Sequence, residues 1–66
     1  MSVAKVIEIS ADSDKSFEDA IQQGIETASK TVDDIKGAWI KEQQVLIDDG
    51  KIVGFRVDLK VTFVLK

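Results

Sequence analysis

The stretch GFRVDLKVTFVL, residues 54–65, decides the fold. Its odd-numbered positions, from Phe55 to Leu65, are all apolar, whereas its even-numbered positions are mostly glycine, polar or charged. Successive side chains of a β-strand point to opposite faces, so this alternation predicts a strand over about residues 51–65 with one core face and one polar face. Such a strand needs partner strands at its edges and a layer over its apolar face.

A hairpin is predicted directly before this strand. The tripeptide DDG at residues 48–50 favours a tight turn because Asp and Gly tolerate positive φ. We therefore expect an extended segment over about residues 35–47 to pair antiparallel with the last strand. Its apolar residues change phase, from an even position at Ile40 to an odd position at Val45. This change predicts a bulge or a bend near residues 42–44.

Residues 16–31 have the three- and four-residue spacing of apolar positions that is typical of an amphipathic helix. Ser16 is the expected N-cap, so the helix begins at Phe17 and carries acidic residues in its first turn. The apolar stripe consists of Phe17, Ala20, Ile21, Ile25, Ala28 and Val32. Gly24 lies on the same face, and it either lets the helix approach the sheet closely or is merely tolerated there.

The N-terminal segment completes the pattern. VAKVIEIS, residues 3–10, is rich in β-branched residues and predicts a first strand, and the polar cluster at residues 11–15 predicts the turn that follows. The order strand, helix, strand, strand predicts an α+β fold, βαββ, in which a three-stranded antiparallel sheet is wrapped around one helix. We expect one domain over residues 1–66.

The composition narrows the classes of function. The 66 residues include no cysteine and no histidine, which excludes disulfides, thiolate or imidazole zinc sites, and nucleophiles paired with histidine. A chain this short buries only roughly 60% of the surface that its unfolded form exposes. Because the covalent and metal staples of small proteins are missing, we expect the chain to associate with copies of itself.

The charge and the hydropathy argue against several partners. The net charge is -3, so no global field attracts phosphate backbones and we expect no nucleic acid partner. No apolar run approaches the ~20 residues of a membrane span and no secretory signal is recognisable, which favours a cytoplasmic location without a membrane partner. Glu8, Glu42 and Asp58 lie in alternating strands, where carboxylates are ordinarily solvated or ion-paired, so we expect no enzyme.

Trp39 is the first candidate for a functional residue. If the helix covers the sheet face that carries Ile40, then Trp39 projects from the opposite face together with Gly37 and Lys41. One helix cannot cover both faces, and a large exposed aromatic side chain suits a subunit interface or a platform for a planar ligand. In a third interpretation, a bend in the strand turns Trp39 into the core of its own subunit.

The chain resembles the dodecin family along almost its full length. The resemblance is carried by KVIEIS (5–10), SFEDAIQQGIETASKTV (16–32), IKGAWIKEQQ (35–44) and GFRVDLKVTFVL (54–65). It implies a homododecamer of βαββ subunits, with pairs of flavins stacked at the two-fold interfaces of the flavin-binding members.

The resemblance also implies ligand residues. The stacking tryptophan of flavin-binding dodecins follows the threonine at the helix end by six positions, which is Gly37 here, two residues before Trp39. The glutamine that binds the flavin ring edge corresponds to Arg56, whose side chain only donates hydrogen bonds. We expect Trp39, Arg56 and Gly37 to line a site for FMN or riboflavin, in a dodecameric protein that binds, stores and buffers the flavin.

An alternative follows from dodecin-like proteins that lack this tryptophan and are associated with calcium. Calcium prefers clustered oxygen ligands, and Asp33 and Asp34 are the candidate ligands, with the pair at 48–49 as a further possibility. In this flavin-free assembly, which binds calcium or serves a structural role, Gly37 marks a closed or empty pocket. Arg56 would then pair with a carboxylate across the interface between subunits.

Overall fold

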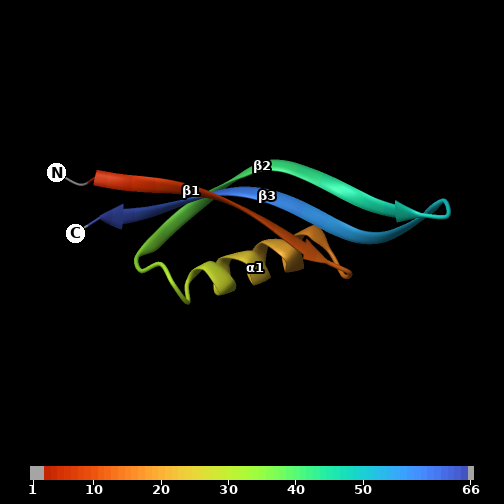
Figure 1. The fold of residues 1–66 in the computed structure, drawn as a ribbon, viewed down its shortest axis with the longest axis horizontal. Helices are drawn as coiled ribbons and strands as arrows, with labels where there is room; N and C mark the ends of the chain where they lie inside the picture. Colours follow the sequence, from red (N-terminus) through yellow and green to blue (C-terminus); the bar gives the residue numbers. More distant parts are fainter. Residues whose placement is uncertain (1–2, 66) are drawn as a thin grey trace.

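The computed structural model of the protein describes residues 3–65. In chain order, the elements are β1 (Val3–Ser13), α1 (Phe17–Ala28), β2 (Ile35–Asp48) and β3 (Lys51–Leu65). The strands form one antiparallel sheet in the order β1-β3-β2, and α1 lies on one face of it against β1 and β3 (Figure 1). The predicted βαββ fold, with one helix and a three-stranded antiparallel sheet, is confirmed.

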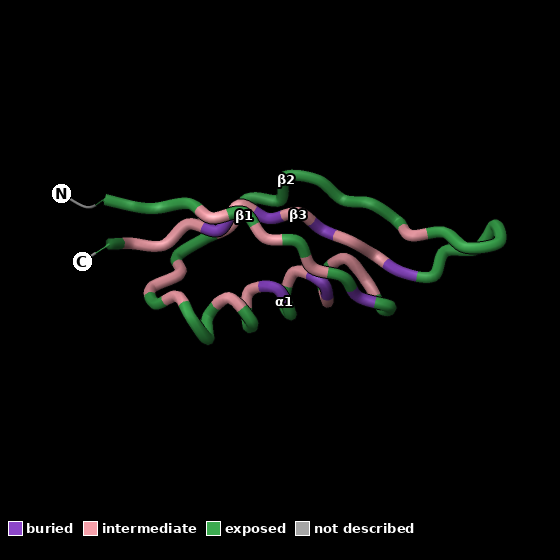
Figure 2. The backbone as a smooth tube through the Cα atoms, in the orientation of Figure 1, coloured by how far each residue is buried: buried purple, intermediate pink, exposed green. Residues whose placement is uncertain are grey.

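The core lies between α1 and the central strand β3. Val57, Leu59 and Val61 of β3 are fully buried, and Ala20 of α1 is buried against them (Figure 2). All three strand residues are odd-numbered members of the alternating stretch. Full burial of an aliphatic side chain of this size stabilises the folded state by about 1.5–3 kcal/mol, so this row holds the helix on the sheet.

The helix begins where the sequence predicts and ends earlier. Ser16 has extended backbone (φ -168°), and its side-chain oxygen accepts a hydrogen bond of 3.0 Å from the Asp19 N–H. The helix ends at Ala28 rather than near residue 31. Beyond it, the Ser29 hydroxyl donates to the carbonyl of residue 25 at 2.8 Å, and such side-chain bonds compete with continuation of the helix.

Gly24 brings α1 close to the sheet. A Cβ atom built at this glycine would lie 3.1 Å from the Cβ of Ala11 and 3.4 Å from the Cδ1 of Leu59. The first of these distances is shorter than an ordinary carbon–carbon contact of about 3.5–4.0 Å. Of the two interpretations that the sequence left open, the structure supports close approach.

The first strand is longer than predicted. β1 continues through residues 11–13, which the sequence assigned to a turn, and pairs Asp12 with Arg56 and Ser13 with Phe55 of β3. The cause is the length of β3, which offers a pairing partner beyond Ser10. The Ser13 hydroxyl is also bound, since it donates to Asp19 at 2.6 Å and thereby lowers the pKa of that carboxyl group.

The change of phase in β2 arises from a bulge. Ile40 pairs with Leu59 and Glu42 pairs with Asp58, so Lys41 is an extra residue in β2. The predicted irregularity exists, one residue before the predicted stretch. Two more register shifts lie between residues 35 and 37 of β2 and near the hairpin.

The hairpin turn matches its sequence. Asp49 (φ 51°) and Gly50 (φ 74°) both have positive φ, as a two-residue turn of type I′ requires. The hairpin projects beyond α1 in Figure 1, so no helix covers its apolar side chains. Its exposed large hydrophobic residues are Val45, Ile47, Ile52 and Val53.

The contact at Gly24 leads to a stability prediction. Gly24→Val places a branched side chain against Ala11 and Leu59, and overpacking of this kind costs about 1–3 kcal/mol. The control is Gly37→Val, because no atom lies within 4 Å of a Cβ built at Gly37. Urea unfolding at one fixed protein concentration measures both variants. Equal midpoints for the two variants would contradict the close approach of α1.

Candidate functional site

The sheet face opposite α1 carries the predicted cofactor residues, and we call it the outer face. Paired residues on neighbouring strands share a face, and the buried odd-numbered residues of β3 point toward α1. The outer face therefore consists of Val6, Glu8, Ser10 and Asp12 from β1, Arg56, Asp58, Lys60 and Thr62 from β3, and Gly37, Trp39, Glu42 and Gln44 from β2.

Trp39 is 73% exposed on the outer face. It is the cross-strand partner of Lys60, and together with Val6 and Thr62 these residues line a shallow hollow of about 230 Å³, the indole hollow. Gly37 pairs with Thr62 beside it. The interpretation in which Trp39 fills the core of its own chain is therefore wrong, and interface and ligand contact remain.

Arg56 lies in a second hollow on the outer face. This polar hollow has a volume of about 320 Å³ and is lined by Glu42, Gln43, Gln44, Arg56 and Asp58. Arg56 is four residues from Lys60, or about 13 Å along β3, so one chain does not bring Arg56 to the Trp39 ring. The structure thus brings Trp39 and Gly37 together and places Arg56 apart from them.

The guanidinium group of Arg56 forms a two-point ion pair with Asp12 of the same chain. The Nε–Oδ1 distance is 2.8 Å, and the Nη2–Oδ2 distance is 2.9 Å. These hydrogen bonds lower the pKa of Asp12 and raise that of Arg56. The carboxylate that the sequence assigned to a neighbouring subunit is supplied within the chain. The sequence predicts that the first strand ends near residue 10, so it does not identify Asp12 as the partner of Arg56.

A second ion pair crosses the outer face. The Lys41 Nζ atom lies 3.1 Å from Oε2 and 3.4 Å from Oε1 of Glu8, so the contact joins β2 to β1 across the central strand. The hydrogen bond and the charge of Glu8 raise the pKa of Lys41. The sequence placed Lys41 on the face of Trp39, but it gave no signal for a partner 33 residues away in the chain.

Asp33 and Asp34 lie in the loop between α1 and β2. They border a hollow of about 320 Å³ with residues 31–32 and 63–65. Asp34 has positive φ (59°), and its carbonyl oxygen accepts a hydrogen bond of 3.2 Å from the Val64 N–H. Within residues 3–65, no group of three or more acidic side chains is placed to hold a metal ion. A calcium site at this loop would need ligands from another chain.

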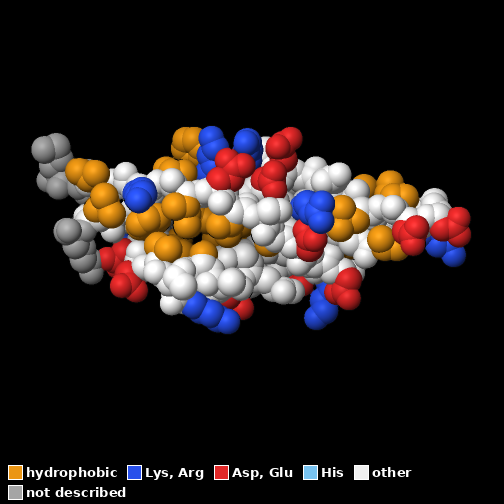
Figure 3. Space-filling model, viewed as in Figure 1, with side chains coloured by type: hydrophobic (Ala, Val, Ile, Leu, Met, Phe, Trp, Pro, Cys, Tyr) orange, Lys and Arg blue, Asp and Glu red, His pale blue; other side chains and the backbone are white. Residues whose placement is uncertain are grey.

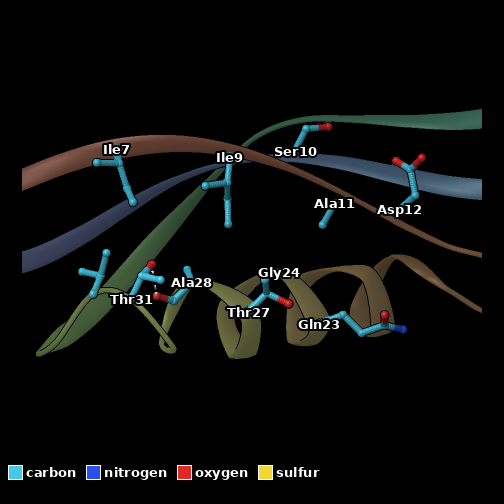
Figure 4. A pocket seen from close by; sticks show the side chains of 11 residues that line it. Ile7, Ile9, Ser10, Ala11, Asp12, Gln23, Gly24, Thr27, Ala28 and Thr31 are labelled. Atoms are coloured by element: carbon cyan, nitrogen blue, oxygen red, sulfur yellow. Dashed lines mark hydrogen bonds between the residues drawn. The ribbon is translucent and has the colours of Figure 1, made fainter.

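A further hollow lies between β1 and α1 and has a volume of about 510 Å³. In Figure 4, Ile7, Ile9 and Ala11 point from β1 toward the helix, where Gly24 lies across from Ala11. Hydrophobic side chains gather along this gap and again on the projecting hairpin (Figure 3). No predicted site residue lies in this hollow, which is the open edge of the core.

The sequence model of the Dodecin family matches residues 3–66 of the chain. The chain belongs to the dodecin family. A calcium dodecin from Mycobacterium tuberculosis is 36% identical over 66 residues, which make up 100% of this chain and 93% of that protein.

Solved dodecin structures have the same fold. A dodecin from Streptomyces davaonensis gives a TM-score of 0.92 at 29% identity and covers 98% of this chain and 96% of that chain. A T. thermophilus dodecin variant gives a TM-score of 0.93 at 29% identity, and the match covers 100% of this chain and 98% of that chain. Calcium dodecin from M. tuberculosis, a calcium-chelating antigen, gives a TM-score of 0.85 at 35% identity. The match covers 98% of this chain and 93% of that chain, and that structure is described with a novel calcium-binding site. Among the described residues, no helix has the length and apolar character to cross a membrane.

The Asp12–Arg56 pair predicts an acid-dependent loss of stability. The lowered pKa means that the pair stabilises the fold above the ordinary value of 3.8 and that this contribution is lost as pH falls through the lower folded value. Asp12→Asn should therefore be less stable than the natural chain near pH 7, and the difference between their urea midpoints should become smaller below pH 4. Urea midpoints measured from pH 7 to pH 2.5 test this prediction. Asp14→Asn, in the exposed turn, is the charge-matched control. A difference in urea midpoint between Asp12→Asn and the natural chain that does not vary with pH would contradict a stabilising Asp12–Arg56 ion pair.

Proposed function

We propose that the protein is a cytoplasmic homododecamer that binds, stores and buffers a flavin, FMN or riboflavin. The observation that carries the proposal is the Trp39 ring, which lies 73% exposed over a hollow on the outer face of a dodecin fold. No catalytic step is part of this proposal.

The exposed apolar surface supports assembly. Only four apolar residues in the described part of the chain are fully buried, whereas large apolar side chains are exposed on the sheet and the hairpin. Exposed apolar side chains in this number are expected at a surface that another copy of the chain covers. The indole hollow, at about 230 Å³, is smaller than the about 300–1,000 Å³ of a complete small-molecule pocket, so we propose that a second copy completes it.

The chemistry of the indole ring supports a flat ligand. Offset stacking of aromatic rings contributes about 0.5–1.5 kcal/mol beyond the burial of area, and the isoalloxazine of a flavin offers a large flat face. Trp39 is two residues beyond Gly37, the position implied by the family resemblance, and lies on the same strand face. The stacking platform is thus displaced by about 7 Å along β2. Gly37 leaves space beside it, since no atom lies within 4 Å of a Cβ built there.

Arg56 is the proposed polar anchor. Its Nε and Nη2 atoms bind Asp12, which leaves the Nη1 hydrogens free of that pair to donate to a ring-edge oxygen. Because Arg56 lies about 13 Å along β3 from Lys60, the cross-strand partner of Trp39, a ligand stacked on that ring would meet the guanidinium group of another copy.

Flavin titration tests the proposal. FMN or riboflavin fluorescence should be quenched on binding, and emission of Trp39, the single tryptophan, should fall with it. Trp39→Leu keeps apolar bulk but removes the ring, so affinity should weaken by about three- to tenfold. Ile47→Leu on the hairpin is the control. Light scattering of the protein used in the titrations should give a molar mass of twelve times the 7.3 kDa of one chain. Unchanged flavin emission at micromolar protein would contradict flavin binding.

Calcium binding is the second candidate, because the relative with 36% identity is a calcium dodecin. We propose Asp33 and Asp34 as ligands, with further oxygen atoms from a neighbouring chain. This version needs no flavin, and the Trp39 ring would then belong to a subunit interface.

Calorimetric titration with calcium tests this candidate. The natural protein should release or absorb heat on binding, and the double variant Asp33→Asn with Asp34→Asn should lose that heat. Asn tolerates the positive φ of Asp34, so the loop should keep its backbone. The matched control changes Asp48 and Asp49 to Asn and should keep the heat. Absence of heat with the natural protein would contradict calcium binding.

A further inference from the structure

The helix-side face of the sheet continues past the end of α1 onto the hairpin. Val45 pairs with Phe55, which belongs to the odd-numbered row of β3 that points toward α1. Ile47 is two residues from Val45 in β2 and points to the same face, and its cross-strand partner Ile52 shares that face. We call Val45, Ile47 and Ile52 the hairpin patch, and these residues are 37%, 64% and 59% exposed. The hairpin patch therefore extends the core face into a region that α1 does not reach (Figure 1).

An apolar depression lies at the open edge of the core, between β1 and α1. This depression, the edge hollow, has a volume of about 510 Å³, and Ile7, Ile9 and Ala11 of β1 are among the residues that line it (Figure 4). Asp12 is the charged residue of the lining, and its carboxylate is already paired with Arg56. Apolar side chains can therefore fill the edge hollow without leaving a charge unpaired.

The hairpin patch does not reach the edge hollow of its own chain. Ile9 pairs with Leu59, and Ile52 precedes Leu59 by seven residues in β3, which is about 23 Å along the strand. Both positions belong to one paired sheet, so this separation is fixed by the register. Any hairpin patch that fills the edge hollow must come from another molecule.

The extent of the exposed surface indicates a second copy of the chain. The accessible surface is 4904 Å², whereas a compact monomer of 7.3 kDa exposes about 4,200 Å². The excess of about 700 Å² is close to the about 800 Å² that one partner buries in a standard interface. The radius of gyration, 13.5 Å, also exceeds the about 11 Å of a compact chain of 66 residues. This elongated chain carries an apolar protrusion and an apolar depression that suit each other.

We propose that the hairpin patch of one copy fills the edge hollow of the next copy, so that the subunits bind head to tail. This inference rests on the proposed assembly and names two surfaces that hold it together. A contact between two different surfaces is heterologous, and in a closed assembly it generates a ring of subunits. Each hairpin thereby extends the core of its neighbour.

Cross-linking of engineered cysteines tests this contact, because the natural chain has no cysteine. The assembled double variant Ile9→Cys with Ile52→Cys is treated with a bis-maleimide that spans less than the ~23 Å between these positions in one chain. Covalent dimers and larger species should appear on a denaturing gel. Each single variant should stay monomeric on the gel, since a head-to-tail contact brings unlike positions together. The matched control is Glu8→Cys with Ile52→Cys, which uses the opposite face of β1 and should not cross-link.

A charge in the hairpin patch tests the contact without cysteines. Ile52→Glu places a carboxylate against the apolar edge hollow, so the assembly should dissociate at protein concentrations about tenfold higher or more. The circular dichroism spectrum should stay that of the natural chain, because Ile52 is 59% exposed in one subunit. Lys51→Met changes the net charge by the same amount at the neighbouring position and should assemble normally. Light scattering over a dilution series measures both variants.

The outcomes separate the contact from the assembly. A covalent dimer from Ile52→Cys alone would overturn the inference, because two hairpins would then meet at a two-fold axis. A double variant of twelvefold mass that does not cross-link, or that cross-links no better than the Glu8→Cys control, would also overturn it and leave the proposed assembly intact. A natural protein with the mass of one chain would overturn both. If the cysteine variants do not assemble, Ile52→Glu and Lys51→Met decide, since equal dissociation of these two would overturn the inference.

Discussion

The rest of the structure depends on the alternation of apolar and polar side chains along β3. This strand is paired on both edges, so its register fixes both neighbouring strands. A slip by one residue would exchange buried Leu59 for Lys60 on the core face, which makes the register strongly specified. The same register sets the outer face, where it places Trp39 beside Lys60 and Asp12 beside Arg56. One strand therefore determines both the core and the candidate site.

The single helix limits what the chain can bury by itself. Gly24 lets α1 lie close to β1 and β3, and the fully buried side chains lie between α1 and β3. The hairpin projects beyond the helix, and no second layer formed by residues 3–65 covers the outer face (Figure 1). Apolar side chains on these surfaces gain from burial only when another molecule covers them. The proposed assembly follows from this geometry as much as from the small size of the chain.

The outer face combines paired charges with one aromatic surface. Exposed ion pairs such as Lys41 with Glu8 contribute little to stability, so their main effect here is electrostatic. They pair Glu8 with Lys41 and Asp12 with Arg56, whereas Glu42, Asp58 and Lys60 of the same face lie outside these two pairs.

The sequence by itself determined the order of the elements, the core face of β3, the helix start after Ser16 and the turn at residues 48–50. These features depend on spacing, capping and turn chemistry among residues close together in the chain. It favoured the uncovered face for Trp39 but left the core of the subunit as an alternative, which the exposure of the ring in the structure excludes. Only the tertiary structure decided the full length of β1, the bulge at Lys41 and the carboxylate partner of Arg56. The two ion pairs join residues 33 and 44 positions apart, and local patterns do not define a register over such separations.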